Sequence, residues 1–384
     1  MAGYVFIENS NKPVKEVADS KGEIILDSVS LPCIEAALKK GYDVVLGVNR
    51  NYPEELYCTL PISFYDSHTY RSITAIGDNI IAFKNLSKVI REYDIEVIHC
   101  NTPIGGLVGR ICGKVFKVKT IIYTAHGFHF YKGAPLINRT LFKAAEYIMA
   151  KWTDVIITMN EEDYSSAQKM KKGSKHIYKV HGVGIDVKSF ELARNNRKEK
   201  RKELKLCDED IAIVSAGDLI KRKNYSTSIK AIAECKNHRI HYFICGKGPE
   251  EEHLISLIKD LHLENQVHLL GFRPDVKDIM GASDIFLFTT LQEGLPRSLM
   301  EAMACGLPCI ASKVRGNVDL IEDRVNGILC DAKDINQFAN AIMTLCSNKT
   351  IREQYAEKSI QSIRNYDVSV VKKEILEIYS KSLG

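Results

Sequence analysis

Two glutamates near the end of the chain have types and spacing that could do chemistry. In the stretch EGLPRSLMEAMACGLPCI, Glu293 and Glu301 lie eight positions apart across the start of an expected helix. Eight residues at about 3.6 per turn would return the second carboxylate to nearly the same face. Between them, Gly294 and Leu295 lead into a helix whose first amides would face an anion, and Pro296 suits the first helical position. The pattern predicts a phosphate site flanked by carboxylates.

These groups favour a ligand that carries both phosphate and hydroxyls. Amide donors and the helix dipole attract phosphate, whereas a carboxylate beside phosphate is repelled unless it holds hydroxyls. A nucleotide-sugar has both groups. From spacing alone, an amphipathic helix with solvent-facing glutamates is an equal alternative. A helix that ends at Gly306 and runs into the apolar strand 309–311 favours the site, because this is an α/β connection.

The elements that must position these residues alternate along the whole chain. Short apolar strands followed by helical patterns are typical of parallel sheets covered on both faces, so the sequence predicts an α/β fold with two Rossmann-like domains. Gly182 and Gly184 mark the expected joint. The expected parts are residues 1–182, 183–365 and a C-terminal helix over 366–384. Strands are expected at 4–7, 44–47, 96–100, 120–124, 155–159, 177–180, 212–216, 241–245, 267–270, 285–288 and 308–311.

Composition supports two ordinary globular domains. The 384 residues exceed the usual size of one core, and 45% are hydrophobic and 26% charged. Eleven scattered cysteines favour a reducing cytosol, and the pair Cys305 and Cys309 lacks the partners of a zinc site. Without an export signal or a run of eighteen apolar residues, the chain is expected to be neither exported nor membrane-spanning.

The segment from residue 114 to 151 is basic and aromatic. Its only acidic residue is Glu146. This combination favours an anionic membrane surface over its two alternatives, a solvated helix face and nucleic acid. The basic residues are Lys114, Lys117, Lys119, Lys132, Arg139, Lys143 and Lys151.

Several motifs in order resemble the retaining glycosyltransferases of family 4, which have the GT-B fold. EGLPRSLME corresponds to their E-x7-E signature, and SAGDLIKRKNYSTSIKAI and FICGKGPEEEHL resemble two of their strand–loop–helix elements. IIYTAHGFHFYKGAP and TDVIITMNEEDY resemble a branch that extends lipid-linked or capsular glycans in bacteria. The resemblance implies two Rossmann-like domains with parallel sheets facing across a cleft, and a last helix that crosses back to the N-terminal domain.

The resemblance assigns the charge that stabilises a leaving diphosphate. Lys223 matches the diphosphate lysine of the family. Most relatives carry an arginine after the glycine, whereas Asp218 follows Gly217 here, so Lys223, helped by Arg222 or Lys221, must supply the charge.

Other roles follow from the same resemblance. Glu293 would bond donor-sugar hydroxyls, Glu301 the ribose hydroxyls, and His126 would touch the donor sugar, with His129 structural. Neither the two histidines nor the D-x-D at 208–210 indicates a metal, and no cofactor is expected beyond the UDP-sugar co-substrate. The expected donor positions also include Gly217, Arg222, Gly246, Phe272, Arg273, Gly294, Leu295, Pro296 and Arg297, and the acceptor positions are Asn101, Gly105 and Gly106. The glycine-rich loop that relatives place after the first strand is missing from IENSNKPVKE.

The resulting hypothesis is a retaining glycosyltransferase acting at the inner face of the cytoplasmic membrane as a cytoplasmic, peripheral protein. It would move a sugar, with N-acetylhexosamine among the candidates, from a UDP-sugar to an undecaprenyl-linked, capsular or exopolysaccharide glycan, without binding nucleic acid. Two alternatives stay open. One is a UDP-N-acetylglucosamine 2-epimerase of the same architecture, and the other is a non-catalytic protein that binds nucleotide-sugars.

Overall fold

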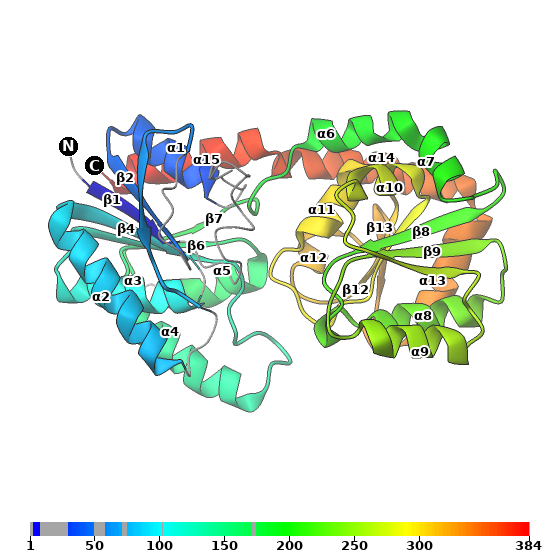
Figure 1. Cartoon of the computed structure of the whole chain (residues 1–384), viewed down its shortest axis with the longest axis horizontal. Helices are drawn as coiled ribbons and strands as arrows, with labels where there is room; N and C mark the ends of the chain where they lie inside the picture. Colours follow the sequence, from blue (N-terminus) through cyan, green and yellow to red (C-terminus); the bar gives the residue numbers. More distant parts are fainter. Residues whose placement is uncertain are drawn as a thin grey trace. The chain divides into compact units, whose positions relative to one another are not determined.

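The computed structural model describes residues 3–7, 30–49, 58–70, 75–101, 103–170 and 174–383. The chain forms two compact units (Figure 1). The N-terminal unit comprises Met1–Gly184 and Val368–Gly384, and the C-terminal unit comprises Ile185–Asp367. The division thus falls two residues after each expected boundary. The segment IENSNKPVKE, apart from Ile7, lies outside the described residues.

The N-terminal unit is built on a seven-stranded sheet with the order β3-β2-β1-β4-β5-β6-β7. Every neighbouring pair is parallel. In Figure 1, α1 and α15 lie together on one face of this sheet, and α2 and α3 lie on the other. The strands are Gly3–Ile7, Asp43–Val48, Ile62–Asp66, Ile95–Asn101, Thr120–Ala125, Val155–Thr158 and His176–Lys179 (β1 to β7). The helices are α1 Leu31–Lys39, α2 Ile76–Glu92, α3 Pro103–Val115, the π-helix η2 Asn138–Phe142, α4 Lys143–Ala150, α5 Glu161–Gln168 and α15 Val368–Ser382.

The C-terminal unit has a six-stranded parallel sheet with the order β10-β9-β8-β11-β12-β13. The strands are β8 Ile211–Ala216, β9 Ile240–Cys245, β10 Val267–Gly271, β11 Ile285–Phe288, β12 Cys309–Ser312 and β13 Gly327–Cys330. The helices are α6 Val187–Leu192, α7 Arg197–Glu203, α8 Tyr225–Cys235, α9 Glu251–Asp260, α10 Val276–Ala282, α11 Arg297–Ala304, α12 Asn317–Leu320, α13 Ile335–Ser347 and α14 Lys349–Ile363. Short helical turns are η3 Ala193–Asn196, η4 Lys221–Lys223 and η5 Arg364–Tyr366.

Successive side chains along the strands of this sheet pack alternately into two hydrophobic cores, one on each face. In β11, Ile285 and Leu287 pack with α8, α9 and α13, whereas Phe286 and Phe288 pack with α10 and α11. Successive side chains point to opposite faces of a strand, so a continuous apolar run is what a sheet covered on both sides requires. The predicted α/β class with two parallel sheets is therefore confirmed.

Helix α15 is fixed to the N-terminal unit by a buried hydrogen-bond chain. The Tyr379 hydroxyl lies 2.6 Å from Nδ1 of His99, and Nε2 of that ring lies 2.7 Å from Oγ1 of Thr124. Burial, with a smaller effect of His126, lowers the pKa of His99 to about 3. The ring is therefore neutral near pH 7, and it joins α15 to the ends of β4 and β5.

Two strands and one interruption were not expected. Strands β3 and β13 lie at sheet edges. The helical run from Asn138 to Ala150 is not one continuous α-helix, because it is divided into the π-helix η2 and α4. Among the described residues, no helix is both long enough and apolar enough to span a bilayer.

Candidate active site

The carboxyl ends of β8 and β11 bring the predicted phosphate lysine into position. After β8, the chain passes through η4 and turns at Asn224, whose backbone is left-handed with φ 57°. The Asn224 side chain donates to the carbonyls of Thr289 and Ala332, both at 3.0 Å. These bonds anchor the residue next to Lys223 against the segment that follows β11.

Lys223 and Glu293 form a nearly buried ion pair. Lys223 Nζ lies 2.9 Å from Glu293 Oε1, and the two side chains are 11% and 9% exposed. Arg222 Nη1 lies 2.7 Å from the same oxygen, and Thr290 Oγ1 donates to it at 2.8 Å. Lys223 Nζ also lies 4.7 Å from the centre of the Phe288 ring. The structure therefore brings together three of the predicted site residues, although their direct pairing was not anticipated.

The geometric argument for the two glutamates is wrong. Helix α11 begins only at Arg297, and Pro296 is its N-cap residue with extended backbone, not its first helical residue. Glu293 therefore lies in the loop before the helix, and its spacing from Glu301 is not a helical repeat. A proline at 296 can end an extended loop because its φ of −79° suits that conformation.

Glu301 makes a separate ion pair one turn into α11. Its Oε1 accepts from Arg297 Nε at 2.8 Å, and its side chain is 14% exposed. Burial raises the pKa of the Glu301 carboxyl, and Arg297 partly offsets this rise. A buried carboxylate with one exposed partner has acceptor capacity for ligand hydroxyls.

Two glycines permit close approach of the loops around the site. A Cβ atom on Gly246 would lie 2.0 Å from the carbonyl oxygen of Gly217, where the ends of β8 and β9 meet. A Cβ atom on Gly316 would lie 2.3 Å from the carbonyl oxygen of Gly294, and Gly316 has φ +79°. Larger side chains at either position would displace the loops that carry the predicted donor residues.

Two of the predicted donor positions, Phe272 and Arg273, differ in the groups that they leave accessible. The side chain of Phe272 is 71% exposed and follows β10. Arg273 is held by Asp275 at 2.6 and 2.7 Å and by Glu203 at 2.8 Å. The hydrogen bond to Asp275 raises the pKa of Arg273 and, reciprocally, lowers the pKa of Asp275. Arg273 thus already has carboxylate partners, and the backbone and ring of Phe272 are the accessible groups.

The N-terminal unit places His126 beside a small cavity. This cavity of about 20 Å³ is lined by His126, Asn101 and Thr124 at the ends of β4 and β5, and its size suits one water molecule. His129 is exposed, with its ring centre 5.7 Å from that of Phe142. The contact of His126 with a donor sugar stays a prediction.

The predicted acceptor glycines lie in the first turns of α3. Gly105 and Gly106 are both buried. A Cβ atom on Gly106 would lie 2.5 Å from the Tyr123 ring, so close packing of α3 on β5 accounts for this glycine. Asn101 is buried at the end of β4.

Two residues of the C-terminal site were missed in the sequence. Thr290 contacts the Glu293 carboxylate, and buried Arg315 donates from Nε to the Glu293 carbonyl at 2.9 Å. Thr290 is the second residue after the apolar run IFLF, and polar residues at the carboxyl end of a parallel strand are the usual ligands of such folds. Arg315 gave no comparable signal.

Comparison with known proteins agrees with this geometry. Residues 196–362 match the family model described as glycosyl transferases group 1, and residues 27–160 match the model described as glycosyl transferase 4-like. A putative glycosyltransferase EpsD of Bacillus subtilis is 29% identical over 307 residues, 79% of this chain and 81% of that protein. The UDP-Gal:alpha-D-GlcNAc-diphosphoundecaprenol alpha-1,3-galactosyltransferase of Escherichia coli is 28% identical over 331 residues, 84% and 85% of the two chains. HepE of Anabaena, crystallised with UDP-glucose, has a TM-score of 0.76 at 21% identity and covers 99% of this chain and 100% of its own.

The fold and the site define the protein as a glycosyltransferase with the GT-B fold. Within this class, the N-terminal part of the chain matches the glycosyl transferase 4-like model, and the C-terminal part matches the model of glycosyl transferases group 1. The predicted family is confirmed.

Proposed function

We propose that the protein transfers a sugar from a UDP-sugar, with retention of the anomeric configuration, to a lipid-linked or exopolysaccharide glycan. N-acetylhexosamine is among the candidate sugars. The observation that carries the proposal is the convergence of Lys223 and Arg222 on Glu293, beside the loop that leads into α11. The named functions of the E. coli relative and the nucleotide bound to HepE support the substrate classes.

The cations would stabilise the leaving diphosphate. As the bond from the anomeric carbon to the β-phosphate oxygen breaks, negative charge accumulates on that oxygen. Lys223 is held within a few ångströms of Glu293 in a largely buried position, where a charge interaction is stronger than in water. We propose that this charge makes a divalent metal unnecessary, so that activity persists in the presence of a chelator.

Retention would follow from attack on the face that the phosphate leaves. The acceptor hydroxyl oxygen bonds to the anomeric carbon on that face, while its proton moves to the departing phosphate oxygen. Glu293 is engaged by Lys223, Arg222 and Thr290 and is therefore suited to orient sugar hydroxyls. This role needs no covalent intermediate on the enzyme.

A panel of UDP-sugars with an undecaprenyl diphosphate-linked acceptor tests the proposal. Release of UDP should require both donor and acceptor, and the coupling constant of the new anomeric proton should show the donor's configuration. Inverted product would refute retention. Conversion of a UDP-sugar into its epimer without acceptor would identify the epimerase alternative, and full glycan synthesis in cells carrying Glu293→Ala would support a non-catalytic role.

We also propose that η2 and α4 contact an anionic membrane at the inner face of the cytoplasmic membrane. Leu136, Ile137, Leu141 and Ile148 are 75%, 60%, 62% and 53% exposed. Exposed cationic side chains interleave with them, namely Lys132, Arg139, Lys143 and Lys151. Apolar groups beside cations match the chemistry of an anionic lipid surface.

Vesicle co-sedimentation tests this surface. The double variant Ile137→Ser and Leu141→Ser should bind phosphatidylglycerol vesicles about tenfold or more weakly, because two large apolar side chains leave the interface. Ile255→Ser on α9 is the control, since Ile255 is also exposed, at 41%, but lies in the other unit. Equal binding by all three proteins, or binding to phosphatidylcholine vesicles as strong as to phosphatidylglycerol, would contradict the assignment.

A further inference from the structure

A second cavity lies in the C-terminal unit at the amino ends of its strands. Its volume is about 540 Å³, within the range of small-molecule sites. Its lining includes Asp284 and Pro308, which directly precede β11 and β12, and one face of α14. Lys223 and Glu293 instead follow the carboxyl ends of β8 and β11. The strands are parallel, so this amino-end cavity and the candidate active site lie at opposite ends of one sheet.

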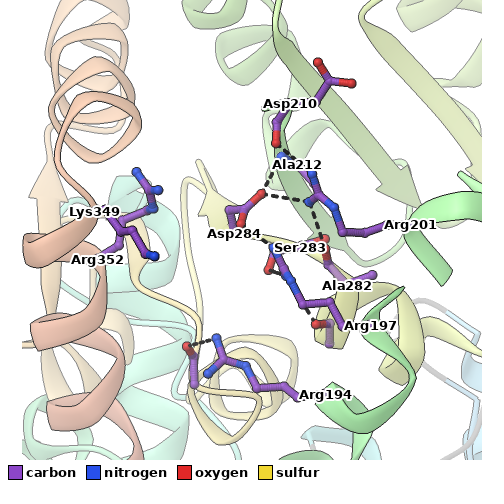
Figure 2. Close-up of polar contacts among 12 residues, drawn as sticks. Arg194, Arg197, Arg201, Asp210, Ala212, Ala282, Ser283, Asp284, Lys349 and Arg352 are labelled. Atoms are coloured by element: carbon purple, nitrogen blue, oxygen red, sulfur yellow. Dashed lines mark hydrogen bonds and ion pairs between the residues drawn. The ribbon is translucent and has the colours of Figure 1, made fainter. Parts of the chain in front are cut away.

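Four cations line the amino-end cavity, and the Asp284 carboxylate among them already has ion-pair partners. Arg194, Arg197, Lys349 and Arg352 contribute to the lining. Asp284 pairs with Arg197 at 2.6 Å and with Arg201 at 3.1 Å. Asp284 also accepts a hydrogen bond from the backbone of Ala212 at 2.8 Å (Figure 2). This carboxylate therefore secures the start of β11 and does not neutralise the other cations.

Two guanidiniums are held in place without a carboxylate. Arg194 Nη2 donates to the Gly306 carbonyl at 2.9 Å. Arg352 Nη1 donates to the Cys346 carbonyl at 3.0 Å and also to Leu345, at the end of α13. Among the described residues, neither guanidinium forms an ion pair. Burial and the nearby Arg197 lower the pKa of Arg194, and Asp284 opposes this shift only in part.

This arrangement matches the recognition of phosphate. A guanidinium fixed at one edge by a carbonyl keeps other N–H groups in a planar fork, which fits two phosphate oxygens. In Figure 2, Lys349 and Arg352 on α14 lie across from Arg197 and Asp284. A phosphate between these walls would supply a counter-charge to Arg194 and Arg352, which form no ion pair among the described residues.

The rest of the lining favours a small hydroxylated body on that phosphate. Glu353 and Glu357 lie one turn apart on the same face of α14. Glu353 Oε1 lies 3.7 Å from Lys349 Nζ, and the remaining carboxylate oxygens can accept from hydroxyls. Pro308, Ala356 and Ile360 add apolar surface for a sugar ring. We propose that the amino-end cavity binds a sugar phosphate at a site separate from the donor site.

The site is joined to the donor-binding helix. Arg194 holds the carbonyl of Gly306, two residues beyond the end of α11. The first turns of the same helix carry Arg297 and Glu301. A sugar phosphate that engages Arg194 should therefore change the affinity for UDP, and UDP should change the affinity for the sugar phosphate by the same factor.

Calorimetric titration of the full chain with glucose 6-phosphate, with and without saturating UDP, tests the proposal. UDP at saturation blocks the donor site, so a second site should still bind one equivalent of glucose 6-phosphate. Inorganic phosphate and glucose are titrated in parallel, and both should bind more weakly. Arg194→Gln should weaken binding by about tenfold or more, because a charge-assisted hydrogen bond is lost.

Two exposed lysines of α14 provide a matched pair. Lys349→Gln should also weaken binding, whereas Lys358→Gln should not, since Lys358 is not part of the lining. Lys349 is 79% exposed, so its variant should fold even if Arg194→Gln does not. The proposal is overturned if no saturable binding occurs up to about 10 mM, a range that covers weak metabolite affinities. Equal loss in both lysine variants, or equally tight binding of inorganic phosphate, would also overturn it.

Discussion

Replacement of Lys223 by methionine would separate the structural from the catalytic role of the charged cluster. Methionine keeps much of the packing against Phe288 but removes a charge 2.9 Å from Glu293 Oε1. A hydrogen bond to a charged group contributes about 1.5–3 kcal/mol. Loss of a whole buried pair costs about 3–5 kcal/mol, but Arg222 and Thr290 still contact the carboxylate, so the lower range applies.

Stability must be measured on the C-terminal unit itself. The only tryptophan, Trp152, lies in the N-terminal unit, so its fluorescence would miss the change. Hydrogen exchange in α8 and α11 reports on the correct unit and should show opening that is easier by about 1.5–3 kcal/mol. In transfer assays, kcat should fall by about 10²–10³, the usual loss for one group that stabilises developing charge.

The double variant Lys223→Met with Glu293→Gln distinguishes the two roles. The neutral amide no longer needs a counter-ion, so protection from exchange should return toward the wild-type value. Activity should stay low, because the phosphate still lacks its cation. Arg222→Met is the control and should disturb exchange less, since the Arg222 side chain is 39% exposed. Wild-type activity in the double variant would refute the reasoning.

Three further predictions concern Glu301, His99 and Gly316. Glu301→Ala should raise the Michaelis constant for the donor by roughly 10–150-fold with the fold intact, because a charged hydrogen bond to the ligand is lost; an unchanged constant would remove Glu301 from the site. His99 has a folded pKa of about 3 against an ordinary value near 6.5, so the unfolded chain binds the extra proton between these values. Stability should therefore fall as the pH drops from about 6.5 toward 3, by up to about 1.4 kcal/mol per unit, and urea unfolding of His99→Gln should show a shallower dependence. Gly316→Ala should weaken UDP binding measured by calorimetry, since its Cβ atom would lie 2.3 Å from the Gly294 carbonyl; wild-type affinity would contradict this packing.

Most strands that the sequence predicts are buried on both faces, although the predicted edge strands β7 and β10 are only partly buried. In β5, all six residues of TIIYTA are buried, so the apolar run is continuous. The missed strands β3 and β13 lie at sheet edges, and their burial is incomplete. In β3 only Tyr65 is buried, and in β13 the central residues Ile328 and Leu329 are partly exposed. An edge strand has only one neighbour, so its side chains can be partly exposed and the apolar signal weakens.

The site was predictable as a set of residues but not as a set of contacts. Lys223 and Glu293 are seventy residues apart, and they meet because β11 pairs directly with β8. Strand order is not encoded in the local patterns, so the ion pair could not be derived from spacing. The eight-residue spacing of the glutamates misled for a related reason: a helical period has meaning only inside a helix, and α11 begins after Glu293.

Helix α11 connects the carboxyl end of the C-terminal sheet to its amino end. In a parallel α/β unit, a crossover helix runs from the carboxyl end of one strand to the amino end of the next. Helix α11 thus begins beside the loop of Glu293 and ends near Gly306, which Arg194 holds. Leu299, Met300 and Met303 on this helix are fully buried, and close-packed interiors transmit displacement instead of absorbing it. A shift of the Gly306 end should therefore move Glu301 as well, and this rigidity is what would let a ligand in the amino-end cavity alter donor affinity.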